Sequence, residues 1–109
     1  MENTNQHNFI LWLEFEHSDY SDSDMENELC NVIVDLPDGR RYGINVWTYK
    51  FLETIEKINQ NSGEELAGLY IVPPDLFVKV LTRECIEKTI SDLLKRGNLE
   101  DVLNPSVLS

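Results

Sequence analysis

The sequence predicts an α+β domain with a mostly antiparallel five-stranded sheet and two helices on one face, in the order β-β-β-α-β-β-α. Several segments alternate apolar and polar residues, which is typical of half-buried strands, and tight-turn residues join two of them into a hairpin. Two other segments carry apolar residues on one side at helical spacing. The 109 residues, 41% of them hydrophobic, are expected to form a single domain over residues 1–109 with a real core.

Residues 9–16 are expected to form the first strand, because their side chains alternate with a period of two. One face has Phe9, Leu11, Leu13 and Phe15, and the other has Ile10, Trp12, Glu14 and Glu16. The second face is only half polar, so apolar side chains are expected on the uncovered side of the sheet. The polar residues 1–8 are expected to be a flexible tail.

A strongly acidic segment follows the first strand. Residues 14–28 contain seven acidic residues and no Lys or Arg, while the rest of the chain has 13 acidic and 9 basic residues, a net charge of only -4. Serines at positions 18, 21 and 23 add to its turn-forming composition. Residues 17–28 are therefore predicted to be a mobile acidic loop.

A β-hairpin is predicted over residues 29–46. Alternation resumes at residues 29–36 and again at residues 42–46. Between them, Pro37 fixes φ, Asp38 can bond its own backbone and Gly39 accepts a positive φ, which together favour a tight turn.

The first helix is expected to begin after Thr48 as N-cap and to end at Gly63, with an apolar stripe that includes Ile55 and Ile58. Residues 69–72 and 76–81 are both predicted strands, connected by two prolines that cannot donate to a ladder. The second helix is expected to begin at Thr82 and to end at Gly97, with a further turn over residues 99–103.

Charge and hydropathy exclude several classes of function. A net charge of -11 and a pI near 4.4 disfavour binding to nucleic acid phosphates or to an anionic membrane. The longest apolar run, residues 9–13, is too short to cross a bilayer, and the start of the chain lacks the pattern of a secretory signal. Two cysteines without a CxxC pair are expected to be reduced, so we predict a cytoplasmic protein.

The sequence contains no catalytic or metal-binding signature, so we predict that the protein is not an enzyme and uses no cofactor or metal. His17 could meet Cys30 or Cys85 only in three dimensions. A calcium loop beginning at Asp22 would need Gly and Glu where Asn27 and Ile33 stand. The histidines and cysteines lack zinc-ligand spacing, and the glycines form no phosphate-binding loop.

Two features exceed what a minimal α+β domain needs, and both suggest protein binding. The acidic loop could attract a basic partner, and apolar side chains on the uncovered sheet face could be buried in the contact. The candidate partner-binding residues are Ile10, Trp12, Asp19, Asp22, Asp24, Glu26, Glu28 and Tyr70. The alternatives are a merely solvated loop, and an apolar strip covered by the chain's own ends or by a homodimer.

Short motifs carry a resemblance to known proteins. They are Asp38-Gly39-x-x-Tyr42, Trp47-Thr48, Gly63-Glu64-x-Leu66-x-Gly68-x-Tyr70, Pro74-Asp75-x-Phe77 and Leu81-Thr82-Arg83-x-x-Ile86. Residues 32–103 resemble small uncharacterised bacterial proteins, similar in style to the immunity proteins of polymorphic-toxin systems. This resemblance implies an α+β fold and a stoichiometric inhibitor that covers a toxin's active site, and it transfers no site residue.

The leading hypothesis is therefore a non-enzymatic, cytosolic protein-binding domain, an immunity-type inhibitor of a basic toxin. The rival hypotheses are a small enzyme or ligand-binding domain whose site combines residues remote in sequence, and a structural homodimer.

Overall fold

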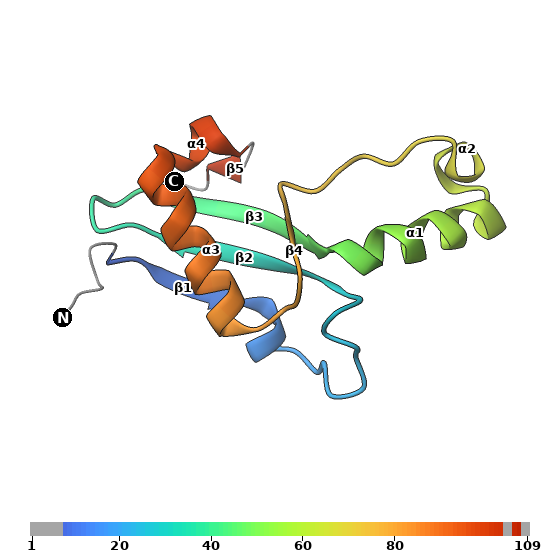
Figure 1. Cartoon of the computed structure of the whole chain (residues 1–109), viewed down its shortest axis with the longest axis horizontal. Helices are drawn as coiled ribbons and strands as arrows, with labels where there is room; N and C mark the ends of the chain where they lie inside the picture. Colours follow the sequence, from blue (N-terminus) through green and yellow to red (C-terminus); the bar gives the residue numbers. More distant parts are fainter. Residues whose placement is uncertain (1–7, 104–105, 108–109) are drawn as a thin grey trace.

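The computed structural model describes residues 8–103 and 106–107, and of the last two only the backbone. The predicted tail, residues 1–8, lies outside the described residues apart from Asn8. The strands are β1 (Ile10–Leu13), β2 (Leu29–Asp35), β3 (Arg41–Thr48), β4 (Leu76–Val78) and β5 (Ser106–Val107). The helices are α1 (Tyr49–Ser62), α2 (Glu64–Gly68), α3 (Arg83–Arg96) and α4 (Leu99–Val102), and a 3₁₀ turn, Glu14–Glu16, follows β1 (Figure 1).

The sheet is mixed, which makes the predicted five-stranded, mostly antiparallel sheet wrong. Its path is β1-β2-β3-β4, four strands wide, in which β1, β2 and β3 are antiparallel and β4 runs parallel to β3. The two-residue β5 pairs with the β4 side of β3, at Tyr42 and Gly43, and was not predicted. The first strand is also shorter than expected, because the chain turns into the 3₁₀ segment after Leu13.

The hairpin that joins β2 to β3 lies where the sequence places it. Gly39 has a φ of 94° and its amide donates to the Leu36 carbonyl at 3.0 Å, which closes the turn. Asp38 accepts the Arg40 amide at 3.1 Å. Because the turn fixes the register, all seven residues of β2 are paired with β3, from Leu29 opposite Trp47 to Asp35 opposite Arg41.

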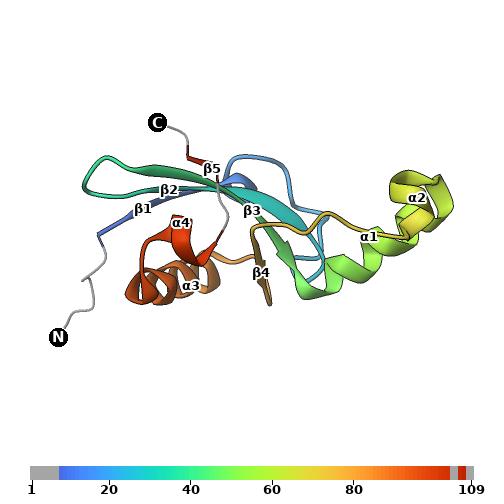
Figure 2. The same cartoon turned by 90° about the horizontal axis from the view of Figure 1, so that it is seen from above.

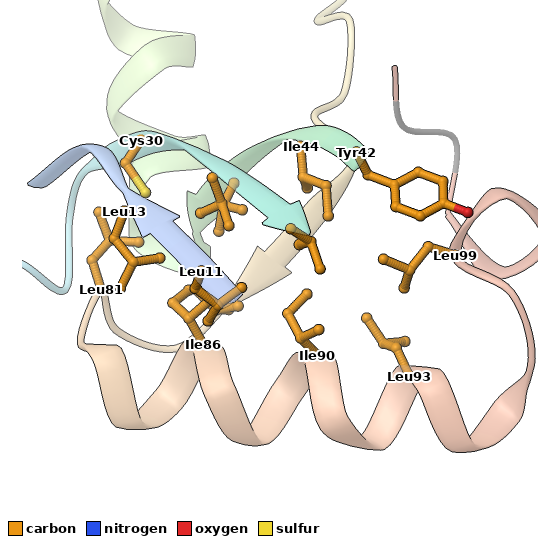
Figure 3. Close-up of a cluster of buried hydrophobic side chains, with 14 residues drawn as sticks. Leu11, Leu13, Cys30, Tyr42, Ile44, Leu81, Ile86, Ile90, Leu93 and Leu99 are labelled. Atoms are coloured by element: carbon orange, nitrogen blue, oxygen red, sulfur yellow. The ribbon is translucent and has the colours of Figure 1, made fainter. Parts of the chain in front are cut away.

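The core lies on one face of the sheet, between the strands and α3. Alternate residues of β1, β2 and β3 are buried there, and Ile86, Ile90 and Leu93 of α3 point toward them (Figure 3). Leu99 of α4 closes one end of this layer. Figure 2 shows both α3 and α4 beneath the same face. None of the helices within residues 8–103 lies on the opposite face of the sheet.

Polar contacts cap the start of α3 and join it to the first strand and to the 3₁₀ turn after it. The Thr82 hydroxyl caps the helix by accepting the Cys85 amide at 3.1 Å, at the residue where the sequence predicts that this helix begins. Arg83 holds both carboxylate oxygens of Glu16, at 2.8 and 2.7 Å, and also donates to the Leu11 carbonyl at 3.2 Å. This guanidinium lowers the pKa of Glu16 and satisfies a carbonyl of strand β1.

Helix α1 does not cover the sheet, so the expectation of two helices on one face is wrong. It continues from the end of β3 and projects away from the core, and the chain returns past α2 to β4 (Figures 1 and 2). We call residues 49–75 the arm. The radius of gyration is 15.2 Å, whereas a compact domain of this length would have about 13 Å. Only Phe51 and Asn59 of α1 are buried.

Residues 69–72 do not form the predicted strand. Because α1 carries the chain beyond the end of the sheet, these residues belong to the returning part of the arm and lie away from the edges of the strands. The next predicted strand is present only as Leu76–Val78, beside β3. A parallel pair needs a crossover of a dozen or more residues, which the arm supplies and a short proline-containing turn cannot. None of the helices in the described part of the chain is long and apolar enough to cross a membrane.

The tip of the arm is strained. Glu65, Leu66 and Ala67 all have left-handed φ values, between 50° and 58°, and each such residue costs about 1–2 kcal/mol. Glu65 holds the turn in place, because its carboxylate accepts the Asn59 side-chain amide at 2.6 Å and the Val72 backbone amide at 3.2 Å.

This strain predicts opposite effects for two neighbouring substitutions. Ala67→Gly is expected to raise the free energy of unfolding by about 1 kcal/mol, because glycine adopts a positive φ without a steric penalty. Gly68→Ala is expected to lower it, since φ is 86° and the new methyl would lie 3.1 Å from Cγ of Gln60 and 3.3 Å from the Glu56 carbonyl oxygen. Urea denaturation of both variants tests this, and destabilisation by Ala67→Gly would contradict the left-handed turn.

Candidate functional site

The helix-free side of the sheet, which we call the open face, carries the outward residues of β1, β2 and β3. Strand register aligns them in rows. One row is Ile10, Asp35 and Arg41, the next is Trp12, Ile33 and Gly43, and beyond it Asn31 lies opposite Asn45. Ile10 is 71% exposed and Trp12 37% exposed, although Leu11 and Leu13 between and beyond them are buried. The predicted uncovered apolar strip is therefore present on β1.

An open hollow of about 310 Å³ lies in the middle of this face. Trp12 lines it on the β1 side and Asp75 lines it on the β4 side, with Ile33 and Gly43 between them. Asp75 is fixed there by two bonds with Asn45: its amide donates to the Asn45 carbonyl at 3.0 Å, and its carboxylate accepts the Asn45 amide at 2.8 Å. The hollow thus combines an indole, an apolar floor and a carboxylate.

Trp12 is held in its exposed position by the start of the acidic loop. Its ring stacks on His17, with centroids 5.1 Å apart and planes 4° from parallel. One side of the indole is therefore occupied by a neighbour in the chain. An ordered aromatic side chain loses little conformational entropy when a partner buries it, which suits an interface anchor.

The acidic loop is tied to the fold at several points. The Tyr20 hydroxyl donates to the Leu29 carbonyl at 3.0 Å, and the Leu81 amide donates to the Met25 carbonyl at 2.8 Å. Glu28 and Thr48 exchange two hydrogen bonds of 3.0 Å, one between backbones and one to the threonine hydroxyl. The loop's backbone is therefore hydrogen-bonded to the rest of the fold at Tyr20, Met25 and Glu28, whereas the carboxylates of the other acidic residues are exposed.

A second hollow, lined by carboxylates, adjoins the first. Glu14, Asp19 and Glu28 line it together with Tyr20, and both hollows share Asn31. Glu14 accepts the Asn31 amide at 2.8 Å, which places this carboxylate at the edge of the open face. Burial and the nearby Glu14 and Glu28 raise the pKa of Tyr20 to about 12, so its hydroxyl stays protonated.

Most of the acidic residues of the loop have no cationic neighbour among the described residues. Glu26 pairs with Lys50 at 3.0 Å, whereas among residues 8–103 no cation lies within 4.0 Å of the other four loop acids named as candidates. On the open face, the charge of Arg41 is balanced by Asp35 at 2.5 Å. Hydrogen bonds from Ser21 lower the pKa of Asp19 and keep it charged.

The structure separates one candidate from the rest. Ile10, Trp12 and the acidic loop lie around the open face, but Tyr70 follows α2 at the far end of the arm (Figure 1). It belongs to a different exposed apolar surface. Seven of the nine exposed large hydrophobic residues in the described chain are in the arm; these are Tyr49, Leu52, Ile58, Leu66, Leu69, Tyr70 and Val72. A joint patch of Trp12 and Tyr70 is therefore wrong.

Several residues that line the two hollows were not predicted as site residues. Ile33, Gly43 and Asn45 could have been found from strand alternation, since Ile33 interrupts a run of outward polar positions in β2. Asp75 could not, because its place depends on the parallel pairing of β4 with β3. One alternative was that C-terminal residues cover the apolar strip. Of these residues, Val102 and Leu103 pack against the core, the side chain of Val107 is not described, and Leu108 lies outside the described residues.

Cys30 and His17 are not arranged as a catalytic pair, because they lie on opposite sides of the sheet. Cys30 points into the core on the helix-covered face and is fully buried, and this burial raises its pKa to about 12. His17 lies against Trp12 beside the open face. No group of three or more metal-ligating side chains is gathered within residues 8–103.

The difference between the two cysteines predicts a labelling pattern. In the folded protein at mildly alkaline pH, iodoacetamide is expected to modify Cys85, which is half-buried, and to leave Cys30 unmodified. Cys30 should react only after denaturation, which peptide mass spectrometry can follow. Equal rates for both thiols in the folded protein would contradict the burial of Cys30.

Comparisons with known protein families, with curated proteins and with solved structures find no match to this chain.

Proposed function

We propose that this protein binds a cationic protein through the open face of its sheet and the acidic loop beside it. The observation that supports this most directly is the placement of exposed Trp12 next to carboxylates whose backbone is fixed. Aromatic side chains at the centre of an interface supply buried area, and charges at its rim increase the association rate. The function needs no catalytic group.

An immunity-type inhibitor is the specific form that we propose for this binding. The partner would then be a basic toxin, and the open face would cover its active site. Two free cysteines, one of them buried, are compatible with a reducing compartment, and we propose the cytoplasm as the location.

The function can be tested by affinity capture from the native host with three forms of the full chain. The wild type is expected to retain one basic protein at equal stoichiometry. The variant Asp19→Asn/Asp22→Asn/Asp24→Asn should associate with it about ten-fold more slowly and with a weaker salt dependence.

The matched control is Glu64→Gln/Asp92→Asn/Asp101→Asn, which changes the net charge equally but on α2, α3 and α4, away from the acidic loop. Its association rate should remain within about two-fold of the wild type, because exposed charges beyond a Debye length are screened. Equal slowing by both triple variants would show that net charge alone matters, and it would remove the acidic loop from the interface.

Self-association through the arm is a second candidate function, favoured by the number of apolar side chains exposed there. A stable interface removes about 800 Å² from each partner, and a 14-residue helix with its returning segment is long enough to supply it. Light scattering distinguishes the two: a dimer that Ile58→Glu converts to a monomer would support the arm, and a monomeric wild type would exclude it.

A further inference from the structure

We propose that the hollow of the open face is a binding site for an arginine side chain of the partner. This inference rests on the proposed function and specifies what the partner must present. The site consists of the Trp12 indole on one side, the Asp75 carboxylate on the other, and Ile33 and Gly43 between them.

The hollow is large enough to admit one planar cation. Trp12 lies in the row of Ile33 and Gly43, whereas Asp75 pairs with Asn45, two residues along β3. The backbones of Trp12 and Asp75 are therefore about 16 Å apart, three strand spacings across and two residues along. The indole and the carboxylate both line the hollow between them, whose volume is about 310 Å³. Gly43 has no side chain to fill that space, and it faces Ile33 directly across the two strands.

The chemistry of the walls favours arginine over other side chains. A guanidinium group stacks on an indole, and its parallel N–H donors match the two oxygens of a carboxylate. Its aliphatic stem can lie on Ile33, which is apolar and half-buried. A lysine has no planar group to stack on Trp12, and an acidic side chain would be repelled by Asp75.

Asp75 is positioned before any partner arrives. One of its oxygens accepts the Asn45 backbone amide at 2.8 Å, and its own amide donates to the Asn45 carbonyl. These two bonds orient the carboxylate, so that little ordering is left to be done on binding. The positive charge of Arg41 on the same face is balanced by Asp35 at 2.5 Å and does not repel the ligand.

The acidic hollow next to this site determines how a partner segment is oriented on the open face. It shares Asn31 with the arginine site and carries the carboxylates of Glu14, Asp19 and Glu28. A partner segment whose arginine enters the sheet hollow can therefore place a second basic residue over the loop. The expected partner surface has two neighbouring basic side chains, at least one of them an arginine.

The test uses the full chain and the peptide Ac-Gly-Arg-Gly-NH₂, with otherwise identical peptides that contain lysine or the neutral isostere citrulline. In nuclear magnetic resonance titrations, the arginine peptide should shift the signals of Trp12, Gly43 and Asn45 with saturation. The citrulline peptide should show no saturable shift, and lysine should bind more weakly than arginine.

Two variants check the role of the carboxylate. Asp75→Asn keeps an oxygen that can accept the Asn45 amide and removes the charge. It should lower the affinity for the arginine peptide about ten-fold. Asp92→Asn on α3 is the control and should change the affinity by less than about two-fold.

Other results would overturn the inference. Equal shifts with citrulline and arginine would make the hollow a site for uncharged side chains. Shifts confined to residues 19–28, equal for lysine and arginine, would indicate non-specific attraction to the loop. In both cases, capture of a basic protein that still depends on the loop acids would leave the proposed function standing.

Discussion

Ile90→Ala is expected to lower the free energy of unfolding by about 3 kcal/mol, within the 2–5 kcal/mol typical of large-to-small core substitutions. Ile90 is fully buried in the layer between α3 and the sheet. Its removal would leave a cavity among side chains that α3 holds in place. For a domain whose total stability is of the order of 5–15 kcal/mol, this is a large fraction, and urea denaturation will measure it.

Ile58→Ala is the matched control, because it is the same substitution on the other long helix. Ile58 is 49% exposed on α1 and does not belong to the core. Its replacement should cost less than about 1 kcal/mol, since little apolar area returns to water and alanine favours the helix. Equal losses at both positions would mean that α1 packs on a core, as the sequence predicted and the structure does not show.

Trp12→Ala is expected to weaken binding of the captured partner by about 30-fold or more, which corresponds to roughly 2 kcal/mol at an interface anchor. The effect should be mainly on the dissociation rate, because truncation removes contacts that form after encounter. The free energy of unfolding of the free protein should change by no more than about 1 kcal/mol. Trp12 lies outside the core, and its stacking on His17 leaves much of the indole exposed.

Two measurements on this variant separate binding from folding. Surface plasmon resonance gives the association and dissociation rates, and urea denaturation gives the stability. A loss of several kcal/mol of stability would place Trp12 in the core, and unchanged dissociation would place the interface elsewhere. Leu69→Ala in the exposed part of the arm is the binding control, and it should leave both rates unchanged.

Turn residues, helix-end residues and strand alternation correctly predicted the features that depend on residues close together in the sequence. The turn at Pro37, Asp38 and Gly39, the cap at Thr82 and the left-handed Gly63 lie where their residue types require them. Alternation placed Leu11 and Leu13 in the core, and it placed Ile10 and Trp12 outside it. These features involve neighbours within a few residues, which is why the sequence alone was sufficient.

The failed predictions concern long-range arrangement. The segment at residues 69–72 is rich in strand-forming residues, but a strand needs an edge to pair with, and α1 carries this segment beyond the sheet. Both long helices have one-sided apolar patterns, yet only α3 meets the core. Tyr70 was placed beside Trp12 for the same reason, and the role of Asp75 depends on a parallel strand pair that periodicity does not reveal.

The most direct test of binding at the open face is hydroxyl-radical footprinting of the full chain with and without the captured partner. The proposal predicts that Ile10 and Trp12 lose most of their oxidation in the complex, while Leu66, Leu69 and Tyr70 keep theirs. Protection of those three arm residues with Trp12 still fully oxidised would contradict it and would assign the interface to the arm.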